Sequence, residues 1–91
     1  MAGNKRKVEV NQNIGVRVML ARRKAKLTQK EVARQVPMSP TALNRLENGL
    51  QSVSGECIAA LARILHVSAD WLLGVADEDE DGAMLVMKAV A

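Results

Sequence analysis

Residues 27–49 read LTQKEVARQVPMSPTALNRLENG and contain two helix starts and one helix end. Thr28 is followed three residues later by Glu31, the spacing of a capping box in which each side chain satisfies an orphan amide at a helix start. Ser39 suits the N-cap of a second helix, and the proline after it suits the first helical position. Gly49 is a typical residue just past a helix end. The stretch therefore predicts two short helices joined by a tight turn.

Outside this pair, apolar spacing and capping residues predict three more helices. The first runs from about Asn13 to Lys24, the fourth begins after Ser54, and the fifth lies between Ser68 and Gly74. Each has an apolar stripe at helical spacing. The expected core residues are Ile14, Val18, Ala21, Val32, Ala33, Val36, Ile58, Leu61, Ala62 and Leu65.

The composition supports a compact all-α domain of five helices. The chain has 91 residues, 48% of them hydrophobic, with no Phe or Tyr and one Trp, so aliphatic residues and Met must form the core. No apolar run approaches the roughly 20 residues that cross a bilayer, and we expect a cytoplasmic protein without a membrane segment. Cys57 is the one cysteine, and we expect it to be a buried, unreactive thiol.

Charge divides the chain more sharply than the net value of +3 suggests. Residues 1–76 hold twelve Lys and Arg against five Asp and Glu, whereas residues 77–91 hold one Lys against five acids. We interpret residues 1–12 as a flexible basic N-terminal arm, 13–75 as the folded domain, and 76–91 as an acidic linker with a short apolar tail. A positively charged domain is suited to an anionic partner. The basic cluster of the arm is Lys5, Arg6 and Lys7.

The predicted helix that follows Ser39 has two contrasting sides. On a helical wheel the polar side spans about 140° and lies opposite the side that carries Leu43 and Leu46. Its guanidinium, amide and hydroxyl groups match the base edges of a DNA major groove, which is wide enough for a helix. A merely solvated surface is the alternative interpretation. The polar side consists of Pro40, Thr41, Asn44, Arg45 and Asn48.

These features together resemble a known family. Residues 27–49, followed by ALARILHVSADWLLG at 60–74, are similar to the Cro and phage-repressor type (XRE-type) of helix-turn-helix domain. The resemblance covers residues 13–74 and includes T-Q-x-E-x-A, L-E-N-G and V-S-x-D-x-L-L-G at the family spacing. It implies a lambda-repressor-like fold of five helices that binds double-stranded DNA.

The resemblance also implies roles for single residues. Arg45 is the strongest candidate for base recognition, as a two-point donor to guanine; the alternative is a surface ion pair with Glu31 or Glu47. Base-reading positions are matched by Pro40, Thr41 and Arg45, with Asn44 nearby. Phosphate-contacting candidates are Thr28, Gln29, Ser39 and Asn48. The cluster Lys5, Arg6 and Lys7 resembles the basic arms with which some such domains contact DNA; a role in solubility is the alternative. Arg22 and Glu47 match a structural ion pair between the first and third helices.

Two prolines depart from the family pattern. Pro40 stands where similar proteins often carry a donor to DNA, so one base contact is reduced to apolar contact with a thymine methyl. Pro37 occupies a turn position where the family usually has glycine with positive φ, which the proline ring forbids. We therefore expect the second helix to end by another geometry.

The first helix has more apolar surface than one core face requires. Val16, Met19 and Leu20 fall opposite its core stripe. They are candidates for an interface covered by the tail, a second subunit or another protein, or they are tolerated surface residues. Trp71, mostly a core residue, and Leu85 in the tail are the other interface candidates.

The sequence favours a transcriptional regulator, typically a repressor, acting as a homodimer on a palindromic operator. The alternative is a protein-binding regulator, such as an antitoxin or a repressor partner, that uses the first helix and the tail. An enzyme is not expected, because no nucleophile–base pair or phosphate-binding glycine loop is present. His66 has no second ligand in a metal-site spacing, and we expect no metal and no cofactor.

Overall fold

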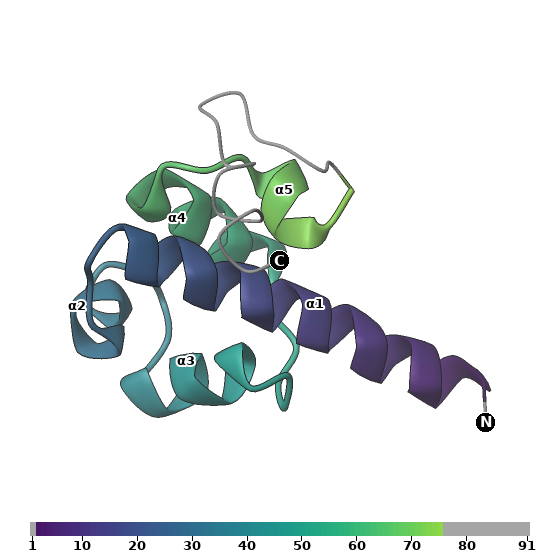
Figure 1. Ribbon diagram of the computed structural model, residues 1–91. Helices are drawn as coiled ribbons and strands as arrows, with labels where there is room; N and C mark the ends of the chain where they lie inside the picture. The colour runs from purple at the N-terminus through teal and green to yellow at the C-terminus, as the bar shows by residue number, and fades with distance from the viewer. Residues whose placement is uncertain (1, 76–91) are drawn as a thin grey trace.

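Helix α1 (Ala2–Lys24) runs through the middle of the protein, and the other helices pack on two sides of it. A computed structural model describes the backbone of residues 2–75 and the side chains from residue 10 onward within that range. Helices α2 (Gln29–Ala33) and α3 (Pro40–Glu47) lie on one side of α1, and α4 (Gly55–Leu65) and α5 (Ala69–Leu73) lie on the other (Figure 1). The described residues form five helices joined by short turns and loops, with no strand among them, which confirms the predicted all-α class.

Helix α1 begins much earlier than the sequence predicted. The flexible arm over residues 1–12 and the start near Asn13 are wrong for the described backbone, which is helical from Ala2. Once residues 13–24 are docked, extending the helix adds a hydrogen bond per residue without a new nucleation cost, and Asn11 Nδ2 donates to Ser52 Oγ at 3.3 Å. The side chains of Lys5, Arg6 and Lys7 lie outside the described residues. The predicted linker and tail, residues 76–91, also lie outside them.

The predicted N-caps are confirmed. Thr28, Ser39, Ser54 and Ser68 each have extended backbone and accept a hydrogen bond from the third backbone N–H of the following helix. The capping box is complete, because the Thr28 N–H donates to Glu31 Oε1 at 3.0 Å and the Glu31 N–H donates to Thr28 Oγ1 at 3.1 Å. Local sequence therefore places the starts of α2 to α5.

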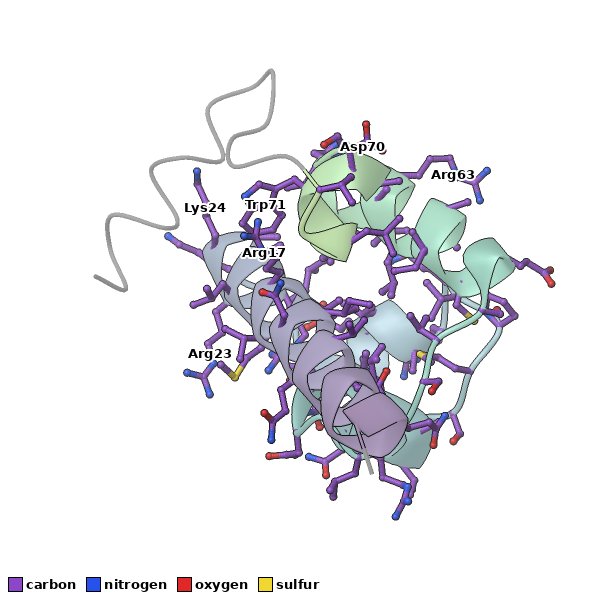
Figure 2. All side chains as sticks on the ribbon, turned by 90° about the vertical axis from the view of Figure 1, so that its right-hand side faces the viewer. Arg17, Arg23, Lys24, Arg63, Asp70 and Trp71 are labelled. Carbon is purple, nitrogen blue, oxygen red and sulfur yellow. The ribbon has the colours of Figure 1, made fainter. Side chains whose placement is uncertain are left out.

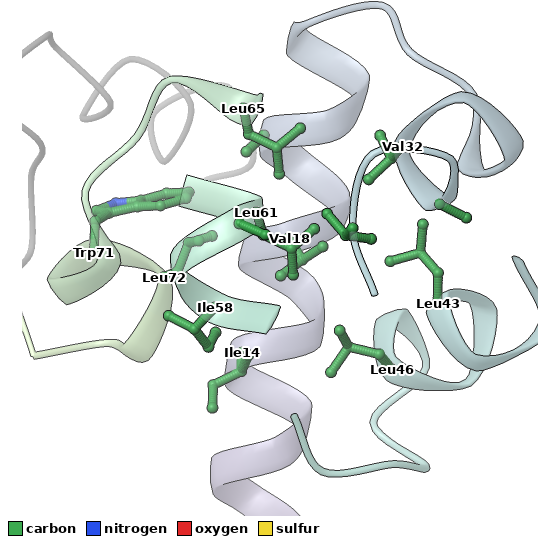
Figure 3. Packing of buried hydrophobic residues seen from close by; sticks show 14 residues of the cluster. Ile14, Val18, Val32, Leu43, Leu46, Ile58, Leu61, Leu65, Trp71 and Leu72 are labelled. Carbon is green, nitrogen blue, oxygen red and sulfur yellow. The ribbon is translucent and has the colours of Figure 1, made fainter. Parts of the chain in front are cut away.

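The hydrophobic core lies between α1 and the two groups of helices on either side (Figure 3). Val18 of α1 is fully buried at its centre, with Leu43 on the α3 side and Leu61 on the α4 side. Burying each such side chain contributes about 1.5–3 kcal/mol. Cys57 is buried and free, as expected. All predicted core residues except half-buried Ala62 are buried.

Gly15 allows α3 to approach α1 closely. A Cβ atom on this residue would lie 2.2 Å from the carbonyl oxygen of Leu46 and 3.1 Å from that of Glu47. Real Cβ atoms do not come this close to backbone oxygen, so any side chain at this position forces the helices apart. The absence of a side chain at Gly15 thus permits α3 to lie at its observed position against α1.

The turn between α2 and α3 avoids the left-handed region. Helix α2 ends at Ala33, its C-cap Arg34 is right-handed, and Gln35 N–H donates to the Val32 carbonyl at 2.9 Å. Among residues 34–39 no φ is positive. The expectation from Pro37, that this helix ends without a left-handed residue, is confirmed.

Candidate nucleic-acid interface

Helix α3 is divided into a buried side and an exposed side. Leu43 and Leu46 are completely buried against α1 and α2. The side chains on the opposite surface are exposed, as the helical wheel predicted. They are Pro40, Thr41, Asn44, Arg45 and, at the C-cap, Asn48. The structure therefore presents amide, hydroxyl and guanidinium groups on the exposed side of α3.

A buried ion pair connects α3 to α1. Arg22 Nε donates to Glu47 Oε2 at 2.6 Å, and Arg22 Nη2 donates to Oε1 at 3.0 Å. The side chains are only 12% and 3% exposed, respectively. Arg22 Nη1 also donates to the Leu27 carbonyl at 2.9 Å. This two-point geometry fixes the last turn of α3 against the scaffold, and its partners are those that the sequence indicated.

From Glu47 a chain of amides leads out to the exposed side of α3. Gln29 Nε2 donates to Glu47 Oε1 at 3.0 Å, and Asn44 Nδ2 donates to Gln29 Oε1 over a longer 3.4 Å. Asn48 Nδ2 donates to the Asn44 carbonyl at 2.8 Å and lies 3.5 Å from Asn44 Oδ1. We call Glu47, Gln29, Asn44 and Asn48 the amide ladder. Sequence reasoning missed it, because its members come from two helices with no local signal.

Arg45 is exposed and its guanidinium does not form the ion pair considered from sequence. Its Nη2 donates to the Leu50 carbonyl at 3.4 Å, and within the described side chains it pairs with no carboxylate. Both acids that the sequence offered are engaged elsewhere, Glu31 in the capping box and Glu47 with Arg22. The Arg45 charge therefore faces solvent beside Asn44.

The electrostatics around α3 favour an anion. The described side chains, residues 10–75, include nine Lys and Arg against four Asp and Glu. Lys30 and Arg34 are exposed on α2 and its C-cap. The capping box holds the pKa of Glu31 below its usual value through hydrogen bonds from the Thr28 backbone and side chain, with Arg34 adding to the effect. The Glu31 carboxylate thus accepts its hydrogen bond from the start of its own helix.

Comparison with known proteins identifies the fold family. A helix-turn-helix family model matches residues 18–72, more than half of the chain. The chain belongs to the XRE-type helix-turn-helix family. It is 32% identical over 81 residues to the HTH-type transcriptional regulator DicA of Escherichia coli (strain K12), which covers 89% of this chain and 59% of that protein's length. The crystal structure of the clp gene regulator ClgR from Corynebacterium glutamicum matches with a TM-score of 0.68 and 28% identity, covering 88% of this chain and 81% of that one.

In this helix-turn-helix protein a second buried arginine was not anticipated. Arg17 of α1 is 7% exposed, and its Nη1 donates to the Trp71 carbonyl at 3.0 Å. Its Nε donates to Asn13 Oδ1 at 3.2 Å, and its guanidinium carbon lies 5.0 Å from the centre of the Trp71 ring (Figure 2). Sequence periodicity places Arg17 beside the core stripe, but only the tertiary position of α5 supplies these contacts.

The interface candidates are only partly at the surface of this helix-turn-helix domain. Val16 is 41% exposed, whereas Met19 and Leu20 are half-buried and Leu20 packs against the core. Trp71 is a core residue, as the sequence mostly indicated, because its side chain is completely buried; it therefore offers no surface to a partner. Leu85 lies outside the described residues. The apolar surface of α1 is therefore smaller than the sequence suggested.

The described residues contain neither a metal-binding cluster nor a membrane-spanning helix. No three His, Cys, Asp or Glu side chains there come together in a group that would hold a metal ion. His66 is the left-handed C-cap of α4, with φ of 58°. None of the helices in this part of the chain combines the length and apolar character needed to cross a membrane.

Proposed function

We propose that this protein is a sequence-specific, double-stranded-DNA-binding transcriptional regulator that represses by occupying its operator as a dimer. The observation that carries the proposal is the division of α3, whose leucines are buried while Asn44 and Arg45 are exposed. Membership of the helix-turn-helix family supports it. The two relatives named above are described as regulators.

In the proposed complex α3 enters the major groove with its polar side toward the bases. Arg45 donates two hydrogen bonds to guanine O6 and N7, a contact that contributes roughly 1–3 kcal/mol of discrimination. Thr41 and Asn44 offer a hydroxyl and an amide to neighbouring base edges, while Pro40 offers only apolar contact to a thymine methyl. Phosphate contacts come from helix starts and the end of α3. They are made by Thr28, Gln29, Ser39 and Asn48.

The short length of α3 supports a dimer. Helix α3 has eight residues, and one such helix contacts only a few base pairs. Two copies related by a two-fold axis read a palindrome whose half-sites lie about one DNA turn apart. We therefore propose a homodimer on a palindromic operator, with Lys5, Arg6 and Lys7 adding phosphate contacts.

Selection of bound sequences from random duplex DNA tests this proposal. The selected sequences should share a palindromic motif, and binding should weaken by orders of magnitude between about 50 and 200 mM salt. Arg45→Ala should flatten the preference for one base pair in each half-site. Arg63→Ala is the matched control, because Arg63 is an exposed arginine of α4 (Figure 2), which lies on the other side of α1 from α3 (Figure 1). No sequence preference in the wild type would contradict the proposal.

Exposed Val16 supports a second candidate, a protein-binding regulator that uses the surface of α1. Sedimentation of the wild type and Val16→Glu, each with and without operator DNA, separates the candidates. If the wild type is a dimer and Val16→Glu is a monomer with weaker operator binding, the surface joins two copies. If neither protein binds any duplex, the protein-binding candidate replaces the DNA-binding one.

A further inference from the structure

The amide ladder gives Gln29 a contact that a phosphate-binding residue does not need. Its side chain is half-buried between α2 and α3. Its amide nitrogen donates to Glu47, and its amide oxygen accepts from Asn44. Glu47 in turn is held by two hydrogen bonds from Arg22. The Gln29 side chain therefore joins a buried ion pair to a residue on the exposed side of α3.

The chemistry of Glu47 determines the direction of the hydrogen bonds that Gln29 and Asn44 donate, whereas Asn48 is oriented by the backbone carbonyl of Asn44. An ionised carboxylate only accepts, so Gln29 must present its NH2 group to Glu47 and its oxygen to Asn44. Asn44 must then present its NH2 group to Gln29, which turns its Oδ1 toward the NH2 group of Asn48. An isolated amide could take either orientation, but here each donor points back toward the carboxylate.

Fixing the orientation of Asn44 has a consequence for base recognition. An asparagine discriminates bases by the places of its donor and its acceptor at the base edge. If Asn44 could flip, it would offer both patterns and discriminate less. We propose that Gln29 is a positioning residue for base recognition, which orients the Asn44 amide through the Glu47 carboxylate. This inference rests on the proposed function and concerns the specificity of the same surface.

The test compares base preferences position by position. Every single base-pair substitution of the selected operator is measured for affinity with the wild type, Asn44→Ala, Arg45→Ala and Gln29→Met. Methionine keeps the length of the Gln29 side chain and removes both of its hydrogen-bonding groups. Gln35→Met is the matched control, because Gln35 is exposed and does not belong to the ladder. Circular dichroism and thermal unfolding of each variant establish that it is folded.

We expect Gln29→Met to lose about tenfold discrimination at the base pairs that Asn44→Ala also flattens. Discrimination at the base pairs read by Arg45 should persist, and Gln35→Met should match the wild type. Glu47→Gln provides a second test. It removes the acceptor-only partner while leaving Gln29 in place, so it should flatten the same base pairs.

Two results would overturn the inference while leaving the proposed function intact. A loss of affinity with Gln29→Met that is equal for all sequences would show a phosphate contact only. If Asn44→Ala changes no base preference, there is no recognition for Gln29 to support. A wild type without any sequence preference is a distinct outcome that would contradict the proposed function itself.

Discussion

Two arginines of α1, the buried Arg17 and the largely buried Arg22, contact different sides of the protein. Arg22 faces α3, where its guanidinium meets the Glu47 carboxylate, and the contacts continue through Gln29 to the exposed surface. Arg17, five positions earlier, faces α5, where it meets the Trp71 carbonyl and ring. Figure 1 shows that α3 and α5 lie on opposite sides of α1. One arginine thus attaches α3, the candidate recognition helix, to α1, and the other attaches α5 to α1.

This difference indicates which contacts bear on specificity. On the α3 side the polar contacts extend from the interior to solvent, so a change in the interior can alter the recognition surface. On the α5 side the contacts described for Arg17 lead to Asn13 and Trp71, within α1 and α5. We therefore expect substitutions on the α3 side to affect stability and base preference together, and those on the α5 side to affect stability alone.

Removing the Glu47 carboxylate should have the largest effect on stability, because it removes the ion pair between α1 and α3. Glu47→Ala leaves the Arg22 charge largely buried without its partner, which should lower the free energy of unfolding by about 3 kcal/mol. Urea denaturation measures this loss. The double variant Arg22→Met with Glu47→Met should recover part of it, because no unpaired charge remains. A loss below about 1 kcal/mol for Glu47→Ala would show that the ion pair does not hold α3.

Adding one methyl group at the crossing of α1 and α3 should have the next largest effect. In Gly15→Ala the new Cβ meets the Leu46 carbonyl oxygen, and overpacking of this kind costs about 1–3 kcal/mol. Operator affinity should also fall, because α3 must move. Gly55→Ala is the matched control, since no atom lies within 4 Å of its Cβ position. Thermal unfolding should show Gly55→Ala as stable as the wild type; equal stability of Gly15→Ala would contradict the close approach.

Arg17→Met tests the α5 side of the comparison. It keeps much of the aliphatic stem and removes the charged hydrogen bond to the Trp71 carbonyl, at a cost of about 1.5 kcal/mol. Trp71 is the one tryptophan of the chain, so its fluorescence emission should change without interference from another indole. Base preferences should remain those of the wild type. Altered discrimination in this variant would remove the distinction between the two sides.

The smallest expected effect is the pH dependence of stability that Glu31 contributes at the start of α2. The folded-state pKa of Glu31 lies below its ordinary value of 4.5, chiefly because the Thr28 backbone N–H donates to the carboxylate. Its contribution to stability is complete above pH 4.5 and is lost as the pH falls through the lowered pKa. In Glu31→Gln this part of the acid dependence should disappear. Urea denaturation at pH 7 and pH 3 checks this: the difference between the two proteins should shrink at the lower pH.

Local rules predicted much of the fold. Ser39 and Ser54 cap helices because their hydroxyls satisfy nearby amides, and Leu43 is buried because it lies on the apolar side of its own helix. These signals lie within a few residues of each other. The start of α1 was missed because residues 2–12 have neither a cap nor an apolar stripe. Their helical structure instead continues a helix that is anchored further along.

The tertiary contacts were beyond the reach of the sequence. The burial of the Arg17 charge depends on the position of α5, and its contact with the Trp71 ring joins residues far apart in the sequence. The hydrogen bond between Gln29 and Asn44 joins α2 to α3, and α3 itself lies close to α1 at Gly15. The exposed side of α3 was predictable, but the groups that orient its side chains were not.

Methylation interference at guanine N7 tests the central claim most directly, because N7 lies in the major groove and is one of the two atoms assigned to Arg45. Operator duplexes are methylated at guanines, and bound and unbound molecules are compared for the wild type and for Arg45→Ala. We predict that methylation of one guanine in each half-site prevents wild-type binding, and that Arg45→Ala binds with no sensitivity at that position. Equal sensitivity of the two proteins at every guanine would contradict the account that α3 reads the major groove through Arg45.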